Sequence, residues 1–340
     1  MVDSSASATL PVVARVPLLM LGMLSLVGGV LAGLARLGWS SPGGNWAAWH
    51  GPLMAAAFFG TVIGLERAVA LGRRWAFVAP LASGCGGLLL LAGSALGAGV
   101  ALVVAAAILS AATWRLHRRQ PQMHSRVLLL ATLLWLYAGL VAVLGLADPL
   151  GGWIGFLVLT IAGERLELSR FLPPSPLARK LFALIVICLL PPLLMSSLPM
   201  LGVPLLALAL WLLRQDVARR NVRQSGLTRF IAVCLLSGYF WLALGALLMF
   251  VSPSHALLRD AALHAVFLGF VFAMVFGHAP VIFPAIVRVR LPYHAGLYVP
   301  LLALNLSLGL RVAGDLSEMV VWRQWGGLLN ALTLLLFIAT

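Results

Sequence analysis

The chain has 340 residues, of which 62% are hydrophobic and only 9% charged, and its mean hydropathy is +1.06. This composition excludes an ordinary soluble protein and indicates a membrane protein. A net charge of +14 would suggest nucleic-acid binding in a soluble chain. Here no basic stripe interleaved with aromatic residues lies outside the apolar stretches, so we expect no nucleic-acid partner.

Apolar stretches of membrane-spanning length run through the whole chain and alternate with short polar connections. About 20 helical residues cross a bilayer core. We therefore predict an all-α fold, a polytopic transmembrane helix bundle of about 12 spans, with residues 1–340 as a single integral membrane domain and no soluble domain. The first span is long and many follow, so we do not expect it to be a cleaved signal. The predicted spans are 17–37, 47–69, 76–96, 98–114, 127–146, 151–168, 181–198, 200–213, 229–251, 261–287, 295–312 and 321–340.

Basic residues fall almost entirely into every second connection. With a cytoplasmic N-terminus, nineteen of the 23 Lys and Arg residues lie at the inner side. The positive-inside rule then predicts that both termini are cytoplasmic. It also predicts the lipid bilayer as a partner, with anionic lipids at the cytoplasmic face. The four basic residues at the outer side are Arg36, Arg259, Arg311 and Arg323.

Ionisable side chains within the spans are candidates for a site, because they are costly in hydrocarbon. In the second span, His50 lies about one turn inside the outer end, and Glu66 and Arg67 lie near the inner end. For these two, snorkelling at the interface is an alternative to a functional role. In the sixth span, Glu164 and Arg165 form either a structural ion pair or a proton or substrate group.

The tenth span carries the densest polar pattern. Asp260 and His264 are four residues apart on one helix face, so the carboxylate can orient the imidazole and raise its basicity. His278 lies about 21 Å further along the axis, too far away to share one metal ion with His264. Pro280 and Pro284, in a span of about 27 residues, predict a break or a strong tilt of the helix, and breaks at membrane depth usually line a cavity or a site.

These same helices resemble the NnrS family, twelve-span bacterial membrane proteins linked to haem, copper and nitric-oxide stress. The second span, from Trp49-His50-Gly51 through Phe59-Gly60 to Thr61-Val62-Ile63, is similar to that family's histidine-containing helix. The segment from His264 through Leu268-Gly269 to Met274 resembles its late helix that opens with His-Ala-Leu. Ile161-Ala162-Gly163-Glu164-Arg165 stands where the family carries Gly-Gly-Arg.

The chain also departs from the family pattern. The family's second span has a further histidine and a glutamate, where this chain has Gly51 and Pro52. The family has an Arg-Val-Ser-Leu-Gly-His-Thr-Gly stretch after its late helix. This chain has His278-Ala279-Pro280 and Val289-Arg290-Leu291 there instead. The resemblance is therefore to a divergent relative, and it implies haem or copper at His50 and His264 and a location in the bacterial inner membrane.

Three functions follow as hypotheses. In the first, the protein binds haem or copper, with His50 and His264 as ligands and Asp260 behind His264. In the second, it is a transporter of a small solute or metal ion. Its pathway would pass the broken tenth helix and the residues His278, Glu164, Arg165, Glu66 and Arg67. In the third, it is an assembly or sensory partner. The sequence contains no phosphate loop, nucleophile elbow or zinc motif, so no motif indicates a soluble-type enzyme.

Overall fold

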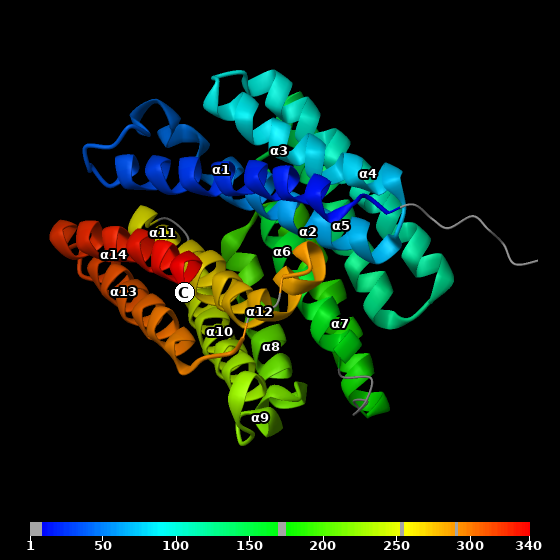
Figure 1. Cartoon of the computed structure of the whole chain (residues 1–340). Helices are drawn as coiled ribbons and strands as arrows, with labels where there is room; N and C mark the ends of the chain where they lie inside the picture. The colour runs from blue at the N-terminus through cyan, green and yellow to red at the C-terminus, as the bar shows by residue number, and fades with distance from the viewer. Residues whose placement is uncertain (1–8, 169–174, 252–254, 290–291) are drawn as a thin grey trace, which may run out of the picture. The chain divides into compact units, whose positions relative to one another are not determined.

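The computed structural model describes residues 9–168, 175–251, 255–289 and 292–340, and this part of the chain contains helices and connections but no strand (Figure 1). The all-α prediction is therefore confirmed. Two of the basic residues expected at the inner side, Arg170 and Arg290, lie outside the described residues. The first seven spans contain α1 (Val12–Arg36), η1 (Gly44–Trp49), η2 (Pro52–Phe58), α2 (Phe59–Leu71), η3 (Arg74–Phe77), α3 (Val78–Leu91), α4 (Ala95–Arg119), α5 (Met123–Leu144), α6 (Leu150–Leu168) and α7 (Pro176–Leu194). The remainder contains α8 (Leu198–Gln215), α9 (Ala218–Asn221), α10 (Gly226–Val251), α11 (Ala256–His264), η5 (Ala265–Phe272), α12 (Ala273–Val287), η6 (Ala295–Leu297), α13 (Tyr298–Leu316) and α14 (Val320–Ala339).

Ten helical stretches among the described residues are long and apolar enough to cross a membrane. The chain is therefore a multi-pass membrane protein by helix length and composition. The two predicted spans outside these ten are α6 and α14. Each carries several strongly polar residues, such as Glu164 and Arg165 in α6 and Arg323 in α14, which lower its hydropathy. The count of twelve stays a prediction.

Hydrogen bonds between helix ends agree with the expected alternation of the spans. The Arg15 guanidinium donates to the carbonyl of Ile286 at 3.0 Å, and both residues were expected at the inner face. The Trp46 indole donates to the carbonyl of Leu91 at 2.9 Å, and both were expected at the outer face. These contacts pair ends of the same predicted side, while the choice of cytoplasmic face stays a prediction.

The described helices group into two compact units. The first contains residues 9–36, 40–160 and 282–289. In it α1 packs along η2 and α3, and α3, α4 and α5 pack in succession (Figure 1). The ring of Trp135 stacks on that of Phe156, with 4.8 Å between their centroids.

The second unit contains residues 37–39, 161–281 and 292–340. In it α10 packs against both α8 and η5, and α11 packs against α13. A short turn joins α13 to α14, so the two helices lie side by side in opposite directions (Figure 1).

The tenth span is helical from end to end, so a break at Pro280 and Pro284 is wrong, and the alternative of a strong tilt stays a prediction. The structure runs through α11, η5 and α12 to Val287 without interruption. Proline is tolerated in a membrane helix where neighbouring helices hold the chain. Pro280 deprives the Phe276 carbonyl of its helical partner, and the Phe276 ring is held by stacking on Phe337, with 3.8 Å between their centroids. The irregular part of this span is the π-helix η5, which precedes the prolines.

Candidate functional site

His50 lies at the start of the second span with its ring against α1. The Nδ1 atom is 2.7 Å from the carbonyl oxygen of Gly29. A Cβ placed on Gly33 would come within 2.9 Å of two atoms of the His50 ring. The glycines on this face of α1 let helices approach closely, and their lack of side chains also leaves room for the His50 ring, a space that we call the seat of His50.

His264 is the last residue of α11, and its ring folds back along its own helix. The Nδ1 atom lies 2.8 Å from the carbonyl oxygen of Asp260 and 3.5 Å from its carboxylate. The side chain is 21% exposed, so the ring sits near a surface of the helix bundle rather than in its centre.

The three histidines within the spans share one hydrogen-bonding pattern. His278 places its Nδ1 2.6 Å from the carbonyl of Met274, as His50 and His264 do with theirs. A carbonyl oxygen only accepts hydrogen bonds, so Nδ1 must carry the proton in each ring. In the neutral imidazole the lone pair is then on Nε2, the nitrogen that metals bind when Nδ1 is held by a backbone carbonyl.

A π-helix follows each of the two histidines expected to be ligands. The π-helix η2 begins at Pro52, two residues after His50, and η5 begins at Ala265, directly after His264. π-Helical turns are rare, and they occur frequently at functional sites. The wider turn changes which side chains share a face with the histidine, so both rings lie where the helical register shifts.

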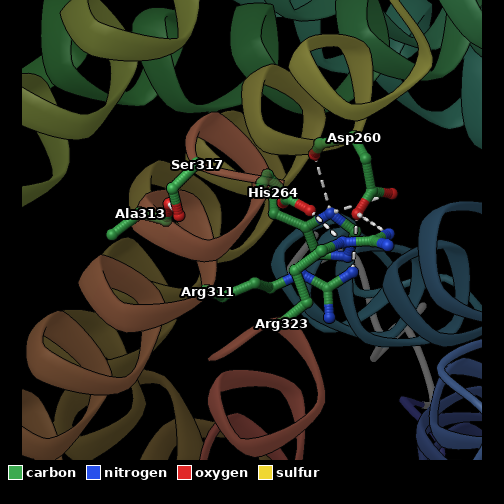
Figure 2. Close-up of polar contacts among 7 residues, drawn as sticks. Asp260, His264, Arg311, Ala313, Ser317 and Arg323 are labelled. Carbon is green, nitrogen blue, oxygen red and sulfur yellow. Dashed lines mark hydrogen bonds and ion pairs between the residues drawn. The ribbon is translucent and has the colours of Figure 1, made fainter. Parts of the chain in front are cut away.

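Charged residues from three helices surround His264 in the second unit (Figure 2). An Nη2 atom of Arg311 on α13 lies 2.7 Å from the Asp260 carboxylate, and Arg323 on α14 approaches the same oxygen at 4.0 Å. Arg323 also donates from Nε to Asp315 on α13. We call these five residues, Asp260, His264, Arg311, Asp315 and Arg323, the charged cluster. With His264 neutral, its two arginines balance its two aspartates.

Asp260 contacts more than the histidine it was expected to orient. Its carboxylate lies 3.5 Å from His264 Nδ1 and also binds Arg311, while the Asp260 carbonyl makes the shorter contact with the ring. In the sequence, Arg311 and Arg323 indicated only the outer side of the membrane, and no motif pointed to Asp315. The four-residue spacing of Arg311 and Asp315 could have indicated a shared helix face.

Comparison with known proteins follows the geometry. The model of a family described as a domain of unknown function, DUF8744, matches residues 15–340. The chain belongs to the DUF8744 family. No curated protein and no solved structure matches this DUF8744 chain. The matched region includes His50 and the whole charged cluster, so both are parts of the family's domain.

The candidate pathway residues of the DUF8744 chain fall into both units. Glu66 and Arg67 lie half-buried on α2 in the first unit. Glu164 and Arg165 on α6 and His278 on α12 belong to the second. Arg165 is buried, and Glu164 and His278 are half-buried. His50 also belongs to the first unit, whereas His264 and Asp260 belong to the second.

Arg165 has a buried partner that the sequence did not reveal. Its Nε lies 3.8 Å from the Asp216 carboxylate, which also accepts a hydrogen bond of 2.6 Å from the Tyr239 hydroxyl. The other Asp216 oxygen accepts from the backbone N–H of Ala218 at 2.7 Å and caps the short helix α9. This ion pair ties α6 to α8 and α10, and the two alternatives for Glu164 stay predictions.

Within the described residues no three His, Cys, Asp or Glu side chains come together as a group that could hold a metal ion. A haem iron takes only one or two protein ligands, and a single imidazole with a defined tautomer is enough for one of them. The candidate ligands of the DUF8744 chain are therefore individual imidazoles rather than a cluster.

Proposed function

We propose that this DUF8744 protein is a multi-pass protein of the bacterial inner membrane that binds haem or copper, with the Nε2 atoms of His50 and of His264 as candidate ligands, each within its own unit. The observation that carries the proposal is the backbone hydrogen bond at each Nδ1, which sets the neutral tautomer with its lone pair on Nε2.

The surroundings of both histidines fit such a group. Neutral imidazole is a common ligand of iron and copper, and a bound haem or copper ion would supply redox chemistry or diatomic-ligand binding. The protein's own part is to hold each ring. His50 is fixed by the glycine face of α1, and His264 by the turn of α11 before η5. The resemblance of these two helices to the NnrS family supports the same proposal.

The charged cluster supports an outer-side position for His264. Arg259, Arg311 and Arg323 are three of the four basic residues expected at the outer face. Arg311 and Arg323 meet at Asp260, in the middle of α11, so these parts of the three helices lie together. If the positive-inside rule sets the topology, His264 lies about one turn inside the outer surface of the membrane.

The transporter hypothesis loses one of its supports, because the helix expected to be broken at Pro280 is continuous. We therefore take the haem or copper proposal forward as the function to test. The test is an absorption spectrum and metal analysis of the detergent-purified protein, reduced and oxidised, from cells supplied with haem and copper. A Soret band identifies haem, and stoichiometric copper without it identifies a copper protein.

Two variants then test the ligands, His50→Ala and His264→Ala, with His255→Ala as the matched control. His255 lies at the start of α11 with a side chain that is 51% exposed and pairs with Glu318. We expect the chromophore or metal to be lost in at least one ligand variant and kept in the control. His264→Met and His50→Met separate ligand loss from misfolding, because a thioether ligand should shift the spectrum rather than abolish it.

Two results would count against the proposal. A colourless, metal-free wild-type preparation would remove the cofactor from the molecule. A chromophore unchanged in both His50→Ala and His264→Ala would remove these histidines as its ligands.

A further inference from the structure

A polar seam runs along the buried contact between α13 and α14. On α13 the seam residues are Ser307, Arg311 and Asp315, spaced four apart and therefore on one face. On α14 they are Arg323 and Asn330. The seam is paired across the two helices at both ends, by the Asp315–Arg323 ion pair and by a hydrogen bond of 2.6 Å from Ser307 Oγ to Asn330 Oδ1.

The seam is partly exposed at the charged cluster, through Arg323 and its partner Asp260, and is buried along the rest of its length. The side chains of Asp260 and Arg323 are 25% and 23% exposed, whereas that of Arg311 is 8% exposed and that of Asp315 is fully buried. Ser307 and Asn330, one turn further along, are also buried. The seam thus has a partly exposed end at the cluster and a closed end inside the helix pair.

Three buried atoms of this seam have no hydrogen-bond partner in the protein. They are Arg311 Nε, Asp315 Oδ2 and Asn330 Nδ2, each on a side chain that is more than nine-tenths buried. An unsatisfied polar atom is costly away from water, and more so on a charged group. Buried polar groups in native proteins almost always have a partner, often an ordered water molecule.

The chemistry of these atoms defines the missing partner. Arg311 Nε and Asn330 Nδ2 are donors, and Asp315 Oδ2 is an acceptor. Arg311 and Asp315 are one turn apart, so a molecule between them must accept from one and donate to the other. It must also be small, because a Cβ on Gly326 would lie 2.6 Å from the Arg311 backbone. Water meets both conditions.

We propose that the α13–α14 seam is a water-binding site that fills from the charged cluster, with ordered water between Arg311 and Asp315 and a second position at Asn330. The proposal does not depend on haem or copper binding. Water molecules at these positions give hydrogen-bond partners to Arg311 Nε, Asp315 Oδ2 and Asn330 Nδ2. They form a hydrogen-bonded chain from the membrane surface to the level of Ser307.

The test is the reactivity of single cysteines toward silver ion, a probe of nearly water size that reacts with thiolates. Cys85, Cys188 and Cys234 are first replaced by Ala in the full-length chain, and Ser307→Cys is introduced. Leu306→Cys is the control at the same depth, because Leu306 is its neighbour and is 66% exposed on the apolar outside of the helix. A thiol in hydrocarbon does not ionise, whereas a hydrated thiol does.

We expect the Ser307→Cys thiol to be blocked by silver at least about tenfold faster than the Leu306→Cys thiol, measured as protection from maleimide labelling after denaturation. Equal rates in the two variants would overturn the proposal. If Ser307→Cys does not fold, Asn330→Cys with Leu329→Cys as its neighbour gives the same comparison. Asn330 is buried in the seam, and Leu329 is exposed at the same depth.

Discussion

Arg311 and Asp260 join α13 to α11 through a contact of 2.7 Å between Nη2 and Oδ2, and Arg311 is the more buried partner. The aspartate that was expected to orient a histidine therefore also compensates the charge of a buried arginine. The carboxylate also faces Arg323 at 4.0 Å, so one acid neutralises the side chains of two helices. Several properties of the molecule depend on this arrangement.

Asp260→Asn should destabilise the protein. It leaves Arg311 buried without its nearest carboxylate, which should cost about 1–3 kcal/mol after allowance for the partial exposure of Asp260. Thermal unfolding of the purified protein in detergent measures the change. Glu318→Gln is the control, because Glu318 is 67% exposed and pairs only at the surface. A wild-type midpoint in Asp260→Asn would show that Arg311 does not need this partner.

Gly33→Ala should displace the His50 ring while leaving His50 itself unchanged in sequence. The added methyl group would come within 2.9 Å of the ring, so the imidazole must move away from the Gly29 carbonyl. We expect a shifted or weakened chromophore together with a lower unfolding midpoint, read from absorption spectra and thermal melts. Gly44→Ala, where a Cβ meets no atom within 4 Å, should leave both unchanged. Identical behaviour of the two variants would contradict the proposed seat of His50.

Tyr239→Phe should destabilise the second unit. It removes the hydroxyl that donates to buried Asp216, which should cost about 1–3 kcal/mol because the carboxylate is left with fewer partners. Thermal unfolding again provides the measurement. The neighbouring Phe240→Leu, on a side chain exposed at the bundle surface, should have a smaller effect. The reverse order of the two effects would show that Asp216 is satisfied without Tyr239.

The C-terminus should face the cytoplasm. The excess of arginine in every second connection predicts this orientation. A C-terminal fluorescent-protein fusion should fluoresce, and a C-terminal alkaline phosphatase fusion should be inactive. Phosphatase inserted between α13 and α14, a connection expected outside, should be active. Active phosphatase at the C-terminus would show that the predicted orientation or the predicted number of spans is wrong.

Arg219 and Arg220 should attract anionic lipid. Both are exposed on α9, at a connection expected to be cytoplasmic. Replacing both by Gln should reduce the binding of fluorescent phosphatidylglycerol to the purified protein, since each basic residue near a lipid surface contributes about 1 kcal/mol. The double variant Arg36→Gln, Arg259→Gln removes the same charge at the predicted outer side and should change binding less. Equal losses would show that total charge alone decides the effect.

Hydropathy was sufficient to predict the helices, because each predicted span is defined by its own residues. All twelve predicted stretches overlap helices of the described chain, and His50 lies next to the start of its helical stretch. The same local information could not show the π-helices. A shift of register depends on how the helix packs against its neighbours, and neither Pro52 nor Ala265 differs from residues in ordinary helices.

The charged cluster and the Asp216 group could not be predicted for a related reason. Which face of α13 meets α14, and which end of α8 meets α10, depends on helix rotation and packing order. Asp216 looked like a loop residue, yet it is buried under Tyr239. Only the spacing of Ser307, Arg311 and Asp315 was visible in the sequence. It indicates that the three residues share one face of α13, but not which helix packs on that face.

The hydrogen bond from Arg15 to the carbonyl of Ile286 spans 271 residues of sequence. The apolar neighbours Leu18 and Leu19 likewise share a core with Ile286 and Val287. During synthesis, the first helix therefore enters the membrane long before the residues that complete its packing leave the ribosome. Its buried arginine must meanwhile be accommodated by water, lipid headgroups or the insertion machinery. Final closure of the first unit is thus a late event of biogenesis, even though that unit begins at the N-terminus.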